Sequence, residues 1–228
     1  MAKSIAFNQT QSIRNVSTVF SSADVISTYQ VAITSTGSNL TPGSRTFTAA
    51  GGTTIVGGAG ASTWTLTAVG DTGAGAVTGF AALTQLGEYA VGSGPTAAAN
   101  AATVDSGSSN ATFSLSTGQV KQIFSAGTND SIITALNVFS QDTAAKTLTL
   151  LRNSGNYYYP ILQVTIPARI TGTPPTIDLL SSAIIPGAVL NSVGKRVYPL
   201  AAGSSLYVAV NTITASCLLT VSVIAEDF

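Results

Sequence analysis

The clearest alternation of hydrophobic and polar positions lies in residues 196–228. Leucine and valine recur at every second position of 206–210 and again of 219–223. A two-residue period over such a run indicates half-buried antiparallel strands. We therefore predict a strand, a glycine turn, a second strand, a short connection and a third strand, paired as a hairpin. Because two strands alone are only marginally stable in water, this hairpin needs a second sheet to cover its apolar face.

Shorter alternating runs precede this stretch and can supply the second sheet. They lie at residues 132–139, 147–151 and 162–166. Small and turn-forming residues separate them, which predicts hairpin connections at 143–145 and 153–156. Proline cannot donate a ladder hydrogen bond, so the strand between Pro160 and Pro167 is expected either at a sheet edge or bounded by these residues.

Residues 118–228 thus offer about eight short strands at a spacing of about ten residues, which predicts an antiparallel β-sandwich of the jelly-roll kind. Within it, residues 176–181 are expected to form one helical turn with Thr176 as its cap. Cys217 is the one cysteine of the chain, so no internal disulfide framework exists. We expect Cys217 at the start of the last strand, buried as a small hydrophobe.

The first half of the chain has a different texture. Residues 24–36 alternate well, and residues 63–69 form a candidate strand around Trp64, but Ala, Gly, Thr and Ser dominate from 47 to 118. Residues 96–110 are so rich in small residues that they indicate a linker or a long loop. The predicted fold is therefore all-β, with a Gly/Ala/Thr-rich, mainly β N-terminal region at 1–117 that carries long small-residue loops, followed by a jelly-roll-like β-sandwich at 118–228.

Charge changes this picture more than any other property of the composition. Only 8% of the residues are charged, with nine basic and nine acidic side chains, against about 25% in ordinary soluble domains. Few charges give little of the repulsion that keeps freely diffusing proteins apart. We infer that neighbours in an assembly cover much of the surface; the alternative is a monomer whose surface is wetted by Ser and Thr.

Several classes of partner are disfavoured. The scattered basic residues form no stripe that would follow nucleic-acid phosphates. No apolar run reaches the roughly 20 residues of a membrane span, and no apolar segment follows Lys3 as in a secretory signal. We therefore expect no nucleic acid, no membrane and release into a cytoplasm.

Candidate catalytic chemistry is sparse. The chain contains no histidine, which removes the usual bases for serine and cysteine nucleophiles and the commonest metal ligand. Asp71-Thr72-Gly73 looks like the active-site turn of aspartic proteases, but its flanking residues are less apolar than in that family, and a Thr/Gly-rich loop produces the triplet by chance. The prediction is no enzyme activity, no catalytic residue, no metal and no cofactor.

Four aromatic residues are candidates for an interface. Tyr157, Tyr158 and Tyr159 form the most suggestive cluster, and Trp64 lies in a predicted strand. Three consecutive tyrosines entering a strand place one or two in the core and leave the others at a rim. The exposed ones could anchor a subunit interface or stack on sugar rings, and we rank the interface first.

A resemblance rests on TNDSIITALNVFSQDTAAKTLTLL, ILQVTIPA, PPTIDLLSS, YPLAAGSSLYVAV and the terminal VSVIAEDF. These segments are similar to a β-sandwich module in virion proteins of tailed bacteriophages and cover about the last hundred residues. The resemblance implies a structural protein of the virion, assembled in the host cytoplasm. It transfers no functional residues, because the module has no catalytic motif.

Two locations in the particle are compatible with that resemblance. The first is a capsid decoration (cement) protein on the outer face of the major capsid protein; the alternative is a tail, fibre or baseplate protein that contacts the host surface. The implied partners are the major capsid protein or other virion proteins. A homo-oligomer is expected, and capsid symmetry suggests a trimer.

Overall fold

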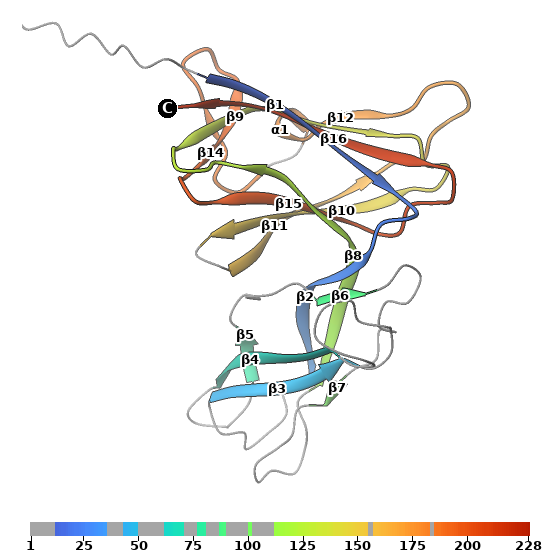
Figure 1. The fold of residues 1–228 in the computed structure, drawn as a ribbon, viewed down its shortest axis with the longest axis vertical. Helices are drawn as coiled ribbons and strands as arrows, with labels where there is room; N and C mark the ends of the chain where they lie inside the picture. Colours follow the sequence, from blue (N-terminus) through green and yellow to red (C-terminus); the bar gives the residue numbers. More distant parts are fainter. Residues whose placement is uncertain are drawn as a thin grey trace, which may run out of the picture.

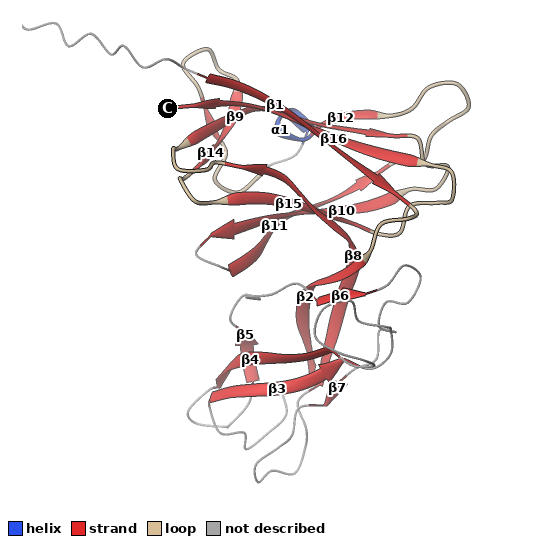
Figure 2. Cartoon of the chain, in the orientation of Figure 1, coloured by secondary structure: helices blue, strands red, loops and turns tan. Residues whose placement is uncertain are grey.

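The computed structural model describes residues 12–35, 43–49, 62–70, 77–80, 87–89, 100–101, 112–154, 157–182 and 185–228. Nearly all regular structure in these ranges is strand, and the one helix among them is the single turn α1 (Leu179–Ser182) (Figure 2). Every strand pair is antiparallel. The prediction of an all-β, sandwich-like fold is confirmed.

Three sheets contain these strands (Figure 1). The first sheet has the order β1 (Ser12–Ser21), β16 (Leu218–Asp227), β9 (Ser131–Ser140), β14 (Arg196–Leu200) and β13 (Val189–Leu190), and β12 (Thr176–Asp178) also pairs with β9. The second has the order β11 (Tyr157–Ile166), β10 (Lys146–Ser154), β15 (Ser205–Val210), β8 (Thr112–Ser125), β2 (Ile26–Ser35) and β6 (Gly87–Tyr89), and β7 (Asn100–Ala101) pairs with β8. The third has the order β3 (Gly43–Ala49), β4 (Ser62–Gly70) and β5 (Val77–Phe80).

The order of the strands in the first two sheets is that of a jelly roll. Four long strands of the first sheet, β1-β16-β9-β14, face four of the second, β8-β15-β10-β11. Along the chain, the path enters the first sheet at β1, crosses to β8, returns to β9, crosses to β10 and β11, returns to β14, and then crosses to β15 and back to β16. Two interleaved Greek keys give this alternation between sheets.

This topology corrects the predicted pairing of the terminal strands. Residues 196–228 were predicted to pair as a hairpin, but β14 and β16 lie in the first sheet, while β15, which lies between them in the chain, belongs to the second. The predicted hairpin at 143–145 is also wrong, because that segment connects β9 to β10 across the sandwich. The one at 153–156 is confirmed, since β10 and β11 are paired neighbours. Among the described strands, β11 pairs with β10 alone, which agrees with the expected edge position of Pro160.

Strand pairing crosses the predicted division between residues 117 and 118. β1 pairs with β16 along its whole length, from Ser12 opposite Asp227 to Ser21 opposite Leu218. β8 spans the division itself, with its first half paired to β2 and its second half to β15. The strands β2 to β7 therefore lie in the connection between two jelly-roll strands, β1 and β8. Figure 1 shows β2 and β8 running out of the sandwich toward β3, β4 and β5.

The core of the molecule lies between the first two sheets. It includes Phe20 of β1, Leu136 of β9, Leu148 and Leu150 of β10, and Val221 of β16, each at most 1% exposed. These residues alternate with more exposed neighbours along β1, β9 and β16, as a half-buried strand requires. Truncating one such leucine to alanine costs about 2–5 kcal/mol, because the site loses apolar contacts and retains part of the cavity.

The second sheet is covered on its outer face as well. Leu151 and Ala209, which alternate with core residues of β10 and β15, are at most 1% exposed. Tyr29 of β2 packs against them, and Thr149 lies 3.5 Å from its hydroxyl oxygen. This explains why the expected half-buried pattern fails for β15, whose six residues are buried on both faces except for the partly exposed Tyr207.

Gly118 of β8 makes the close approach of the Val210 backbone possible. A Cβ atom at this position would lie 2.6 Å from the carbonyl oxygen of Val210 and 3.4 Å from the Tyr29 ring. The first contact is with backbone, which cannot move aside as a flexible side chain can. A glycine is therefore required where β2 and β8 meet the sandwich.

The helical turn α1 overlaps the predicted range 176–181 but begins three residues later, after β12, and its cap differs. The backbone N–H of Leu180 donates to the Asp178 carboxylate at 3.0 Å, so Asp178 caps the turn in place of the predicted Thr176, which lies in β12. Leu179 and Leu180 are buried and join the core. Cys217 directly precedes β16 and is partly buried against the core.

Candidate interaction surfaces

The predicted tyrosine cluster lies at the start of β11, on the edge of the second sheet. Tyr158 is partly buried, and its ring meets that of Tyr207 edge-on with 5.2 Å between the centroids. Tyr159 is 44% exposed, and the side chain of Tyr157 lies outside the described residues. Neither Tyr158 nor Tyr159 belongs to the main core, so these two tyrosines lie at the rim of the sandwich. Their role as an interface stays a prediction.

Tyr207 also belongs to this cluster, although its sequence position alone did not indicate it. Tyr207 lies in β15, two strands away from β11, and its hydroxyl donates to Gln122 Oε1 at 2.9 Å. The signal was its place on the polar side of an alternating strand, where a large aromatic residue needs packing partners. Only the strand order of the sheet shows that Tyr158 is that partner.

Two other predicted positions cannot be placed as sites. Trp64 lies in β4 opposite Phe47 of β3, but both side chains are outside the described residues. Asp71, of the protease-like triplet, also lies outside them. Trp64 as an interface residue stays a prediction.

Charged side chains form a buried, hydrogen-bonded network inside the sandwich. Asp142 and Lys146 form a buried ion pair with 3.1 Å between Oδ2 and Nζ, and their side chains are 0% and 6% exposed. Thr214 donates to Asp142 from both its backbone N–H and its hydroxyl at 2.7 Å, and the N–H of Ala144 donates at 2.9 Å. Lys146 also donates to the carbonyl oxygen of Thr212 at 2.6 Å. This network ties the β9–β10 connection to the β15–β16 connection at one end of the sandwich.

The hydrogen bonds at Asp142 outweigh its desolvation. Burial raises the pKa of this carboxyl group, but donation from Thr214, Ala144 and Lys146 lowers it further, so the pKa lies below the ordinary value of 3.8. The carboxylate is therefore charged at neutral pH despite its burial, and it is a structural group with no exposed oxygen for a substrate.

A second network lies at the opposite end of the sandwich, where β1 and β9 begin and β16 and β8 end. Arg14 lies 2.6 Å from Asp227 through Nε and 2.7 Å through Nη2, and it also donates to the carbonyl oxygen of Ser125 at 2.9 Å. Its guanidinium lies over the Phe124 ring, 4.3 Å from the centroid. Hydrogen bonds from Arg14 and Ser131 hold the pKa of Asp227 below its ordinary value. The ion pair between Arg14 and Asp227 thus anchors β1 to the rest of the sandwich.

Lys121 of β8 anchors the start of the insertion. Its ammonium group lies 2.7 Å from Asp24 Oδ1 and donates to the carbonyl oxygen of Val19 at 2.6 Å. Asp24 also accepts from the N–H of Ser21 at 2.7 Å. A lysine on one sheet therefore holds the turn at which the chain leaves β1 for β2.

Three aliphatic side chains are largely exposed to solvent along β13 and the turn that joins it to β14. Val189, Leu190 and Val193 are 51%, 67% and 74% exposed, all on the segment from β13 to β14. We call residues 189–195 the apolar hairpin. Its loop is well ordered by hydrogen bonds: Asn191 Oδ1 accepts from the N–H groups of Val193 and Lys195, and the N–H of Asn191 donates to the carbonyl oxygen of Lys195. An ordered loop that displays aliphatic groups loses little entropy on binding a partner.

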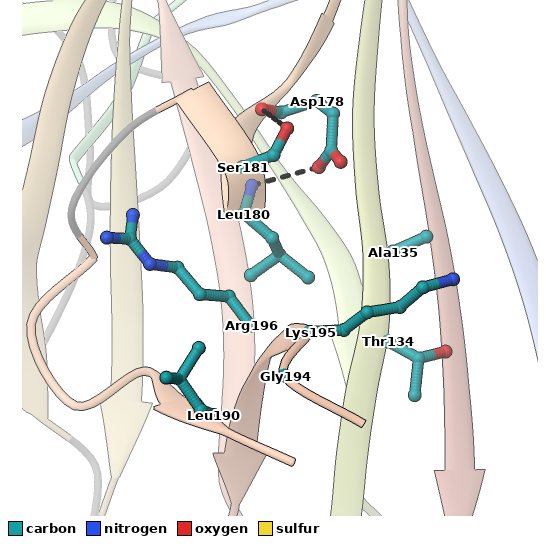
Figure 3. A pocket seen from close by; sticks show the side chains of 9 residues that line it. All are labelled: Thr134, Ala135, Asp178, Leu180, Ser181, Leu190, Gly194, Lys195 and Arg196. Atoms are coloured by element: carbon teal, nitrogen blue, oxygen red, sulfur yellow. Dashed lines mark hydrogen bonds between the residues drawn. The ribbon is translucent and has the colours of Figure 1, made fainter. Parts of the chain in front are cut away.

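A groove of about 540 Å³ lies beside the apolar hairpin (Figure 3). It occupies a break in the pairing of β9: β14 pairs with residues 131–133 and β12 with 137–139, so no described strand pairs with 134–136 on that edge. Figure 3 shows the side chains of Lys195 and Arg196 extending in opposite directions from the groove. The third charged group in its lining, Asp178, caps α1. These charges therefore do not converge on one point, as a small charged substrate would require.

The described residues contain no group of three or more Cys, Asp or Glu side chains that could hold a metal ion. Within the same residues, no helix has the length and apolar character needed to cross a membrane. The clearest surface features that remain are the apolar hairpin, the groove beside it and the tyrosine rim.

The chain was compared with known protein families, curated proteins and solved structures. No protein-family model, no curated protein and no solved structure matches this chain.

Proposed function

We propose that this chain is a non-enzymatic structural protein of a phage particle, a capsid decoration protein bound to the outer face of the major capsid protein. Three observations support the proposal: the low charge of the chain, the resemblance of its last hundred or so residues to a module of virion proteins, and the exposed aliphatic side chains of the sandwich. A decoration protein works mechanically, because it adds contacts between neighbouring capsid subunits.

The apolar hairpin is the observation that carries the proposal. Three aliphatic residues, each more than half exposed, lie on a hydrogen-bonded loop. Three basic side chains, Arg14, Lys121 and Lys146, form ion pairs within the fold instead of facing a partner. Burying such side chains stabilises an interface by about 25 cal/mol per Å² of apolar surface. The exposed Lys195 and Arg196 at the end of the apolar hairpin have to stay at the hydrated rim of such a contact or pair with acidic groups, because desolvating an unpaired charge is costly.

Quantitative mass spectrometry of purified particles tests the proposal. Particles are prepared from a host that produces this chain together with the phage proteins, and the copy number of the chain is compared with that of the major capsid protein. A ratio set by the capsid symmetry supports a decoration protein. Absence of the chain from intact particles would contradict any role in the virion.

A matched pair of variants tests the surface. Val193→Asp places a charge on the apolar hairpin, and Ile170→Asp places the same charge on another exposed loop residue, 81% exposed. We expect Val193→Asp to lower occupancy on the particle while Ile170→Asp retains it. Equal occupancy of both variants would remove the apolar hairpin from the interface.

The second candidate is a tail, fibre or baseplate protein that contacts the host surface. The observation in its favour is the tyrosine rim: Tyr159 is 44% exposed on one face of β11, and Tyr158 meets Tyr207 on the other face. Aromatic rings stack on sugars and anchor interfaces. A copy number that matches the tail symmetry rather than the capsid symmetry would favour this role. A homo-oligomer, taken as a trimer, is part of either proposal, and the mass of the assembled protein tests it.

A further inference from the structure

A cavity of about 420 Å³ lies at one end of the sandwich, away from the groove of Figure 3. We call it the end cavity. Its walls come from both sheets: the start of β9 and the end of β14 from the first, and β10 from the second. The lining residues are Asp130, Ser131, Ile132, Arg152, Pro199, Leu200, Ala201 and Phe228. This volume falls within the range of small-molecule sites, which are also mostly apolar with few polar groups.

Arg152 is placed in this cavity by the period of its strand. Leu148 and Leu150 of β10 point into the core, and a strand returns to the same face every second residue. Arg152 is the next residue on that face and lies opposite Leu206, another core residue. A cation thus takes the place of a core residue at the point where the interior opens.

The guanidinium of Arg152 has unused hydrogen-bonding capacity. Its Nε is buried and has no hydrogen-bond partner among the described residues. Arg14 Nε likewise makes no regular hydrogen bond, but the Arg14 guanidinium forms an ion pair with Asp227 and donates to Ser125 and Ser131. No ion pair of this kind holds Arg152 among the described residues. A buried donor without an acceptor lowers the stability of the fold. A bound ligand that supplies an acceptor to Arg152 would remove this free-energy penalty.

The other polar groups of the end cavity are already engaged. Asp130 Oδ1 accepts from the N–H of Ala202 at 2.8 Å, and the Ser131 hydroxyl donates to Asp227 at 2.6 Å. No hydrogen bond or ion pair joins either residue to Arg152 among the described residues, although the Asp130 carboxylate keeps acceptor capacity and adds a negative charge to the same wall. The remaining walls are aliphatic or aromatic, among them Leu200 and Phe228.

We propose that the end cavity binds a small amphipathic carboxylate. Its apolar body lies against Pro199, Leu200 and Phe228, and its carboxylate accepts hydrogen bonds from Arg152. A guanidinium presents a planar fork of donors that matches a carboxylate, and such charge-assisted bonds are stronger in a partly dehydrated site. This site is separate from the proposed contact with other virion proteins and does not depend on it.

Octanoate is the probe for the test, with octan-1-ol as its uncharged counterpart. The full chain is titrated with each at neutral pH, and backbone amide shifts are followed by NMR. We expect octanoate to give saturable shifts at residues 130–132, 152 and 199–201. Octan-1-ol should bind at least about tenfold more weakly, because it lacks the charged acceptor.

Two variants separate the cation from the cavity. Arg152→Gln removes the charge and should weaken octanoate binding about tenfold or more, while Arg196→Gln, the same change in the other groove, should leave it unchanged. Ala201→Trp fills the end cavity from an exposed position without touching Arg152 and should also abolish binding. This variant and the octan-1-ol comparison keep the test valid even if Arg152→Gln does not fold. Equal affinity for octanoate and octan-1-ol, or no saturable shift, would overturn the proposal.

Discussion

The buried ion pair of Asp142 and Lys146 offers the sharpest test of how this fold is held together. Asp142→Ala removes the acceptor for four donors: the Lys146 ammonium at 3.1 Å, two groups of Thr214 at 2.7 Å each, and the Ala144 N–H at 2.9 Å. The Lys146 side chain, 6% exposed, is then left charged and buried. Breaking a buried pair from one side costs about 3–5 kcal/mol, a large part of the roughly 5–15 kcal/mol that stabilises a typical domain.

Urea unfolding followed by circular dichroism measures this cost, with the slope of the transition checked for a change of mechanism. Asp178→Ala is the matched control, because that carboxylate caps α1 and should cost only about 1 kcal/mol. The double variant Asp142→Ala/Lys146→Met removes both charges, and we expect it to be more stable than Asp142→Ala alone. The reasoning fails if Asp142→Ala costs no more than the control, or if its cost is the same when Lys146 is already methionine.

Further predictions follow from the packing and the charges. Gly118→Ala should destabilise the protein by about 1–3 kcal/mol, because its Cβ would lie 2.6 Å from a backbone carbonyl; an unchanged urea midpoint would contradict this. The pKa values of Asp142 and Asp227 are lowered by folding, so their stabilisation is present above the ordinary value of 3.8 and is lost as the pH falls below it. Urea midpoints measured from neutral pH down to about pH 3 should therefore fall, and fall less steeply in Asp227→Asn. Leu136→Ala should cost about 2–5 kcal/mol, whereas Leu190→Ala on the exposed apolar hairpin should change stability by less than about 0.5 kcal/mol.

The candidate surfaces were only partly predictable. Tyr159 was singled out from the sequence because consecutive aromatic residues stand out in any chain, and it is exposed. The apolar hairpin was not, since Val189 and Leu190 look like ordinary core residues of a short strand until the structure shows them exposed on the edge strand of the first sheet. Arg152 was equally inconspicuous. Its importance comes from the open end of the interior, which no local pattern indicates.

The amino-acid sequence alone was enough to predict the all-β class, the main strands of residues 131–228 and the hairpin around residue 155. It also limited the strand near Pro160 to a sheet edge or to a position bounded by prolines. These features depend on local chemistry: a two-residue period, turn-forming residues and the missing N–H of proline. The low charge also belongs to the sequence alone.

Which strands are neighbours became clear from the three-dimensional structure alone. An alternating pattern says which side chains face a core, but it is equally satisfied by pairing with the next strand or by crossing to the opposite sheet. The long-range pairing of β1 with β16, and the placement of Tyr29 over the second sheet beside Gly118, are set by how apolar faces can all be covered at once. The need to cover all apolar faces at once brings together residues that are far apart in the chain. A short segment of the sequence therefore does not show which strands will pair.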